Sequence, residues 1–171
     1  MTLRLWLTIL AGTLLYGQTF PREPRAFPPD IGPPKITVTG IDGKSTDLTM
    51  AELGKLPQHI VKAAEHGVPV QFEGVLLTDI LAQVARPTGD QFHGTAAGYY
   101  VLIEAADGYK AVFAWAEQDP GFMEKPVYLV THRDGKPLAA KEGPFELVAP
   151  GEKRNGRWVR QVTAISIRQA G

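Results

Sequence analysis

The chain has 171 residues, which is enough for one domain and too few for two of ordinary size. Lysine plus arginine equals aspartate plus glutamate at 18 each, so no overall charge points to nucleic acid or an acidic membrane as a partner. The absence of cysteine excludes disulfide scaffolds, cysteine-ligated zinc, iron–sulfur clusters, covalent haem attachment and thiolate nucleophiles. Serine is present only as Ser45 and Ser166, which gives a serine-based triad little to build on.

Residues 1–17 have the pattern of a secretory signal peptide. Arg4 supplies the positive charge, residues 5–15 form an apolar run, and Gly17 is a small residue at the expected cleavage point. A run of this length is too short to cross a bilayer core, which needs roughly 20 residues. We therefore expect a periplasmic or secreted protein with no membrane span after cleavage, and the alternative is an uncleaved N-terminal anchor.

Residues 18–34 contain six of the 14 prolines and are expected to form an extended linker. Such a density of proline prevents helix and sheet formation because each ring removes a backbone N–H group. A proline-rich ligand for a partner domain is the less common alternative. The folded domain is therefore expected over residues 35–171, where packing alone must stabilise it.

Apolar runs predict strands in the order 36–41, 99–105, 109–114, 127–131 and 158–167. The second run is apolar on both faces, which is typical of a central strand. Three Asp-Gly pairs, at residues 42–43, 107–108 and 134–135, predict two-residue hairpin turns because both positions tolerate positive φ. In the last run the candidates for the buried face are Val159, Val162 or Thr163, Ile165 and Ile167.

Helical signals are fewer. Apolar residues at a 3.6-residue period predict a helix over residues 76–84, which Pro87 and Gly89 would end. A short helix is expected near Thr49–Leu53, with Thr49 as the N-cap and Glu52 as its capping-box partner. The predicted fold class is α+β, dominated by antiparallel strands with a few short helices.

The common catalytic motifs are absent from the sequence, including glycine-rich phosphate loops, G-x-S-x-G and H-E-x-x-H. The four histidines, at positions 59, 66, 93 and 132, include no pair four residues apart. His59 and His66 would share a face of a helix, but Gly67 and Pro69 argue against a helix there. Isolated surface or hydrogen-bonded histidines are therefore favoured over a histidine metal site.

Residues 151–171 form a basic tail with a net charge of +4, because Glu152 alone opposes Lys153, Arg154, Arg157, Arg160 and Arg168. Clustered guanidinium groups match planar oxyanions such as phosphate, which makes this tail a candidate anion site. A basic edge that protects an exposed strand from pairing is an equally good interpretation.

Four further segments match one family pattern in the correct order. Residues 72–81 (FEGVLLTDIL) follow aromatic-x-G-V-x-L-x-D-x-L, and residues 106–109 (ADGY) contain a D-G-Y turn. Residues 143–151 (GPFELVAPG) look like the family's G-x-P-x-R-x-x-x-P-G segment, and residues 156–165 (GRWVRQVTAI) are similar to its closing K-W/I-I/V-K-x-I-x-x-I strand. Over about residues 36–168 the chain thus resembles the molybdopterin-binding domain of the sulfite-oxidase family, in a compact, exported, single-domain form.

The resemblance implies an α+β sulfite-oxidase-type fold and an oxidoreductase that holds molybdenum on a pterin dithiolene. In that family a cysteine thiolate ligates the metal, while an arginine and main-chain groups hold the cofactor phosphate. The cationic position of the closing strand corresponds to Arg160, with Arg157 and Arg154 nearby. The cofactor-binding candidates are therefore Arg154, Arg157, Arg160 and Tyr109.

Several positions depart from the family pattern. The ligand cysteine is expected around residues 64–66, which here read Ala-Glu-His, so His66 is the candidate metal ligand. The phosphate-binding arginine corresponds to Glu146, the neighbouring histidine or asparagine to Glu142, and the polar residue that ends the central strand to Ala105. A carboxylate beside a phosphate is unfavourable by on the order of 4 kcal/mol at about 4 Å and an effective dielectric constant near 20.

Three functions remain open from the sequence. In the first, the chain binds a pterin or molybdopterin, and its activity is at most molybdopterin-dependent oxidoreduction. In the second, it is an accessory subunit that is tethered to an envelope complex. A third interpretation is a cofactor-free module that binds a small anion, a sugar-like ligand or an envelope protein partner. Its cleft would be lined by the tail arginines and by aromatic side chains: Tyr99 or Tyr100, Tyr109 and Trp115. Trp115 and Trp158 otherwise pack in the core, which is the more common role of tryptophan.

Overall fold

The structure is a computed structural model that describes residues 33–87, 98–119 and 125–171. The expected signal peptide and nearly all of the expected linker lie outside the described residues, as does His93. Within the described part of the chain, ten strands form two five-stranded sheets. The chain is an α+β domain of mostly antiparallel strands, which confirms the predicted fold class.

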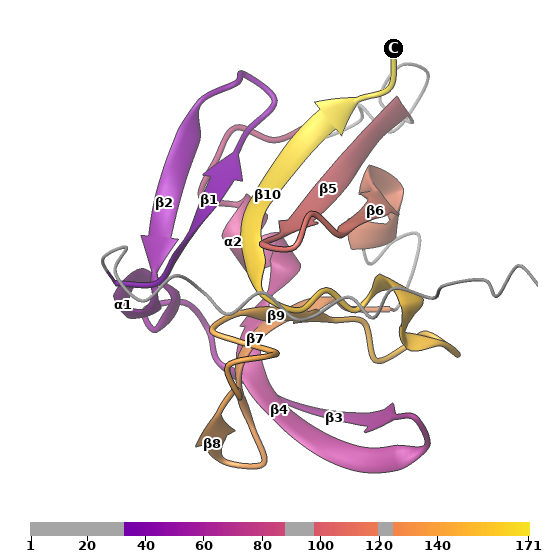
Figure 1. Cartoon of the computed structure of the whole chain (residues 1–171). Coiled ribbons are helices and arrows are strands. Elements are labelled where there is room, and N and C mark those ends of the chain that lie inside the picture. Colours follow the sequence, from indigo (N-terminus) through magenta and orange to yellow (C-terminus); the bar gives the residue numbers. More distant parts are fainter. Residues whose placement is uncertain (1–32, 88–97, 120–124) are drawn as a thin grey trace, which may run out of the picture.

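The first sheet stands in the upper half of Figure 1. In spatial order it consists of β2 (Ser45–Thr49), β1 (Lys35–Thr39), β10 (Val162–Gln169), β5 (Tyr99–Ala105) and β6 (Lys110–Ala114). β1 and β10 pair in parallel, and the other neighbours pair antiparallel. β5 is therefore an interior strand, as predicted. The first and last strands of the domain are hydrogen-bonded neighbours, which joins the two ends of the described chain.

The second sheet crosses beneath the first. Its strands are β3 (His59–Glu65), β4 (Val68–Leu76), β7 (Tyr128–Arg133) and β8 (Lys136–Pro137), and β9 (Glu146–Val148) also pairs with β7. All of these pairs are antiparallel. Figure 1 shows the β3–β4 hairpin extending away from the body of the domain. The sequence did not predict β2, β3, β4, β8 or β9, because their charged residues and prolines interrupt the apolar pattern.

In the described ranges, two short α-helices and two 3-10 helices link the strands: α1 (Met50–Leu53), α2 (Leu77–Leu81), η3 (Trp115–Gln118) and η4 (Asn155–Arg157). The capping box of α1 forms as predicted. The Glu52 backbone N–H bonds the Thr49 hydroxyl, and the Glu52 carboxylate accepts from the Thr49 backbone N–H at 2.9 Å. α2 is shorter than the predicted range, because beyond Leu81 the chain continues as single turns rather than as regular helix.

The predicted Asp-Gly turns exist, but only one has the predicted length. Asp134 and Gly135 both have positive φ, at 50° and 73°, and form a two-residue turn between β7 and β8. The other two pairs lie in longer connections, residues 40–44 and 106–109, where only the glycine has positive φ. A further two-residue turn, His66-Gly67, joins β3 to β4 with φ of 51° and 83°.

The core lies between the two sheets. Val162, Ile165 and Ile167 are buried as predicted, although the last strand begins at Val162 rather than at residue 158. Val159 precedes this strand and pairs instead with Leu147 of β9. This bridge joins the segment before β10, a strand of the first sheet, to β9 of the second sheet.

Gly74 allows the second sheet to bend at its centre. The register between β4 and β7 shifts between Glu73 and Gly74. A Cβ atom at Gly74 would lie 2.2 Å from the carbonyl oxygen of Leu129 and 2.6 Å from the Cα of Val130. The two strand backbones therefore approach so closely that only glycine fits.

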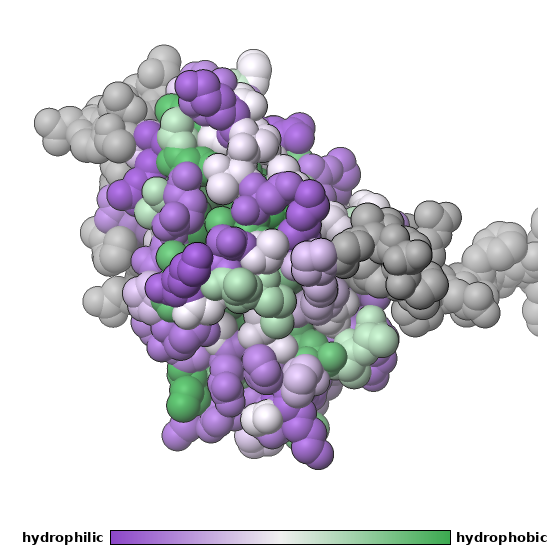
Figure 2. Space-filling view, turned by 90° about the vertical axis from the view of Figure 1, so that its left-hand side faces the viewer, coloured by the Kyte–Doolittle hydropathy of each residue, from purple (hydrophilic) through white to green (hydrophobic). Residues whose placement is uncertain are grey.

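The molecular face seen in Figure 2 is mainly hydrophilic, with hydrophobic residues in small separate areas. Single exposed apolar residues are normal on a soluble surface and mark no interface by themselves. Among the described residues, no helix has the length and hydropathy needed to cross a membrane.

Candidate functional site

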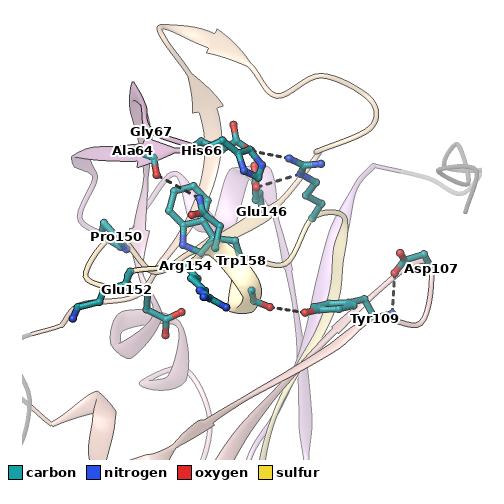
Figure 3. Close-up of a pocket in the computed structure, with 15 residues that line it drawn as sticks. Ala64, His66, Gly67, Asp107, Tyr109, Glu146, Pro150, Glu152, Arg154 and Trp158 are labelled. Carbon is teal, nitrogen blue, oxygen red and sulfur yellow. Dashed lines mark hydrogen bonds and ion pairs between the residues drawn. The ribbon is translucent and has the colours of Figure 1, made fainter. Parts of the chain in front are cut away.

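A cleft of about 940 Å³ lies where three segments of the chain meet. One wall is the tip of the β3–β4 hairpin, another is the β5–β6 turn, and the third is the segment 150–160 that contains η4 (Figure 3). The volume is in the range of ligand-binding clefts. Because all three segments are connections between strands, two sheets hold them in place while their side chains face the cleft.

The structure brings four of the five predicted site residues together. Tyr109, Arg154, Arg160 and His66 all line the cleft. Arg157 does not line it, although it lies only three residues from Arg154. Arg154 precedes η4 in extended backbone, with φ of −137° and ψ of 141°, whereas Arg157 is the last residue of η4.

Arg157 is engaged in holding η4 against the first sheet. Its Nε donates to Glu152 Oε1 at 2.7 Å, and its Nη1 donates to Glu117 Oε2 at 3.0 Å. Its guanidinium also lies over the Phe113 ring, 4.2 Å from the ring centre. With two carboxylates and an aromatic face as partners, Arg157 has a structural role in the described chain.

Two hydrogen bonds fix the cleft walls to one another. The Tyr109 hydroxyl donates to the carbonyl oxygen of Gly156, which joins the β5–β6 turn to η4. The Asn155 side-chain amide donates to the carbonyl oxygen of Ala64 at 3.4 Å, which joins η4 to the β3–β4 hairpin. Trp158 packs edge-on against Phe72 and donates to the Ala149 carbonyl at 3.0 Å, so it combines a core position with a place in the cleft wall.

Lys153 and Arg154 are the free cations of the cleft. Both are exposed and line the cleft, and neither makes an ion pair or side-chain hydrogen bond with any residue that the structure describes. Arg160 and Arg168 in contrast pair with carboxylates from other elements, Glu65 and Glu104. The net charge of the tail is thus largely neutralised, and what remains is concentrated at the cleft.

A cluster of three carboxylates and two guanidiniums lies beside the cleft. Arg160 Nη2 contacts Glu65 Oε1 at 2.7 Å, and Arg133 Nη1 contacts Glu65 Oε2 at 2.7 Å. Arg133 Nη1 also lies 3.4 Å from Glu142 Oε1, and Arg160 Nε lies 3.7 Å from Glu146 Oε1. The five groups come from β3, β7, β9 and two connecting segments, so they meet only in the folded chain.

Glu146 is the member of this cluster that lacks donors. It is 1% exposed, and its Oε2 has no hydrogen-bond partner among the described residues. Burial raises the pKa of Glu146 to about 7; the charge of Arg160 opposes the rise, and the neighbouring Glu142 and Glu65 add to it. Glu65 behaves in the opposite way. Its burial would raise its pKa, but hydrogen bonds and charge from Arg160 and Arg133 outweigh that effect and hold the pKa below its usual value.

The histidines do not form a metal centre within the described residues. His59 and His66 lie at opposite ends of β3, because His66 occupies the turn that follows it. His59 packs near the Tyr128 ring, with 5.7 Å between ring centres. In the described ranges, no three histidine, cysteine, aspartate or glutamate side chains gather in positions that would hold a metal ion.

Comparison with known proteins identifies a structural relative but no sequence relative. No family model and no curated protein matches the sequence. The fold is similar to that of the sulfane dehydrogenase SoxCD from Paracoccus pantotrophus, with a TM-score of 0.62 and 19% sequence identity. The match covers 80% of this chain and 38% of that chain, so this chain spans about two fifths of the neighbour's length. At this identity the likeness shows the fold, which agrees with the sulfite-oxidase-type fold expected from the sequence.

Most of the positions that depart from the family pattern lie at or beside the cleft, but Ala105 does not line it. Residues 64–66, where the metal-ligating cysteine is expected, form the hairpin tip that lines the cleft. Glu142 and Glu146 are both buried in the carboxylate cluster, and Ala105 ends β5 as a buried residue. Arg133 and Glu65 were missed as site residues, because no local pattern shows that β3 and β7 bring them together.

Proposed function

We propose that this domain binds a small anionic ligand in the cleft and that it does so as an exported protein of the periplasm or the cell exterior. The supporting observation is the pair of free cations, Lys153 and Arg154, in the wall of a cleft of about 940 Å³. Side chains whose charges have no partner in the described chain attract an anion without first breaking an ion pair. Tyr109 and Trp158 add aromatic surface to the same cleft.

The residues present do not fit a molybdenum pterin. The expected thiolate position falls at residues 64–66, where both oxygens of Glu65 are bound by guanidiniums. The position of the phosphate-binding arginine is held by Glu146, a buried carboxyl with an unpartnered oxygen. Molybdenum prefers a soft thiolate ligand, and a phosphate is repelled by a carboxylate. Anion binding therefore fits these side chains better than molybdenum-dependent oxidoreduction.

Calorimetric titration of the whole chain with sodium sulfate at low ionic strength tests the proposal. We expect saturable binding that the double substitution Lys153→Ala and Arg154→Ala abolishes. Arg168→Ala is the matched control, because this tail arginine pairs with Glu104 on the first sheet and does not line the cleft. Absence of binding by the unaltered chain, or equal binding by the double variant, would refute an anion site at these cations.

A retained molybdopterin is the second candidate, and the fold likeness to a sulfane dehydrogenase is the observation that favours it. Elemental analysis for molybdenum, together with oxidation to a fluorescent pterin, tests it on protein purified from its native compartment. Stoichiometric molybdenum and pterin would replace the anion proposal with cofactor binding. Absence of molybdenum and pterin from protein that still binds sulfate would support an anion-binding domain without redox chemistry.

A further inference from the structure

The buried carboxyl of Glu146 lies in the lining of the cleft, directly behind the guanidinium of Arg160. The Arg160 side chain is 46% exposed and lines the cleft. Its Nη2 is bound to Glu65, while its Nε faces Glu146 Oε1 at 3.7 Å. This distance is too long for a hydrogen bond but short enough for a strong interaction between charges. The charge state of Glu146 therefore acts directly on the guanidinium that meets the cleft.

One bound proton balances the negative and positive charges of the cluster. Glu65, Glu142 and Glu146 carry three negative charges when all are ionised, while Arg133 and Arg160 carry two positive charges. One bound proton leaves two carboxylates opposite two guanidiniums. Two mainly exposed groups of opposite charge flank the cluster: Lys141, at 3.8 Å from Glu142, and Asp134, at 3.9 Å from Arg133.

Glu146 is the member of the cluster that takes this proton. Glu65 is held ionised by two guanidiniums at 2.7 Å, and Glu142 faces Arg133 at 3.4 Å and Lys141 at 3.8 Å. Glu146 has no donor for its Oε2, and an ionised carboxylate without donors is costly to bury. Its pKa of about 7, raised mainly by burial, agrees with this geometry.

We propose that anion binding in the cleft is coupled to uptake of one proton by Glu146, which acts as a positioning residue through Arg160. An anion near Arg160 disfavours the ionised carboxylate behind it, and the protonated carboxyl in turn strengthens anion binding. This inference rests on the proposed function of the cleft and adds its regulation. The ligand class is an anion whose affinity rises as the pH falls through neutrality.

Sulfate is the probe, because its charge is constant across the pH range of the test. Calorimetry of the whole chain should show roughly tenfold tighter binding at about pH 6 than at about pH 8.5. Titration near pH 7.5 in buffers of different ionisation enthalpy should show net uptake of about half a proton per sulfate, which is the uptake that a tenfold change in affinity implies. His66 also lines the cleft, and histidine ordinarily titrates near neutral pH, so His66→Gln is the control for a histidine effect.

Glu146→Gln should bind sulfate at both pH values with the affinity that the unaltered chain has only at about pH 6, and without proton uptake. His66→Gln should keep the pH dependence. If Glu146→Gln does not fold, Glu142→Gln decides the question, because removal of this like charge should move the pH midpoint of sulfate affinity downward. An unmoved midpoint would overturn the coupling.

The two proposals fail in different ways. If the unaltered chain binds no sulfate at either pH, the proposed function of the cleft is wrong and the coupling falls with it. If sulfate binds without proton uptake, the coupling is wrong and the anion site stands. The same conclusion follows if Glu146→Gln keeps the full pH dependence, or if His66→Gln alone abolishes it.

Discussion

The substitution Glu146→Gln should make the stability of this domain respond differently to pH. Glu146 has a pKa of about 7 in the folded chain, against an ordinary value of 4.5. The unfolded chain therefore releases this proton at lower pH than the folded chain. The free energy of unfolding falls as the pH rises from about 4.5 to about 7, and it stays lowered above that window. At 1.36 kcal/mol per pKa unit the loss is on the order of 3 kcal/mol.

Glutamine has a similar shape and cannot ionise, so the variant lacks this loss. Relative to the unaltered chain, Glu146→Gln should gain on the order of 3 kcal/mol between about pH 5 and about pH 8. Glu65 contributes with the opposite sign in a different window. Its pKa is lowered, so its stabilisation is present above the ordinary value of 4.5 and is lost as the pH falls below it. The comparison above pH 5 therefore mainly reports Glu146.

Urea unfolding followed by tryptophan fluorescence at both pH values measures the effect. The matched control is Glu73→Gln, a partly buried carboxyl on β4 outside the cluster, which should change stability equally at both pH values. The reasoning is refuted if the difference between Glu146→Gln and the unaltered chain is the same at about pH 5 and about pH 8. The reasoning is also contradicted if the stability of Glu146→Gln relative to the unaltered chain is higher at about pH 5 than at about pH 8.

Three other substitutions test structural features of the fold by urea unfolding. Gly74→Ala places a methyl group 2.2 Å from the Leu129 carbonyl oxygen, so it should destabilise by about 3 kcal/mol or prevent folding; a change below about 1 kcal/mol would contradict the close approach of the strands. Thr49→Ala removes the N-cap of α1 and should lower the free energy of unfolding by about 1 kcal/mol, whereas Thr49→Ser keeps the hydroxyl and should keep most of that stabilisation. Arg157→Ala leaves two carboxylates without their partner and should cost about 1–3 kcal/mol; an unchanged free energy of unfolding would contradict its structural role.

Local patterns identified the elements whose signals lie within a few residues. The capping box of Thr49 and Glu52 was predictable because both partners stand in one turn of chain. The interior strand β5 was predictable because apolar side chains on both faces leave no solvent-exposed side. The hairpin turn at Asp134 and Gly135 was predictable because these residue types tolerate positive φ.

The same patterns failed where tertiary contacts outweigh local preference. β3 alternates less exposed and more exposed residues, with Val61 buried, only because β4 pairs along its whole length and one side faces the domain. Its lysine, glutamate and alanine residues alone give no strand signal. The His66-Gly67 turn was missed because histidine is an uncommon first residue for such a turn.

Sequence alone established that the chain has no thiolate for a metal, that its fold is α+β, and that its last 21 residues are basic. The fold decided which of those cations are free. Arg160 and Arg157 are neutralised by carboxylates that lie up to 95 residues away, whereas Lys153 and Arg154 remain without partners in the described chain. The physical reason is that the interaction between two charges depends on their distance in space and not on their separation along the chain. The pairing of β3, β7 and β9 sets those distances. Burial of Glu146 between the sheets likewise appears only when the chain is folded.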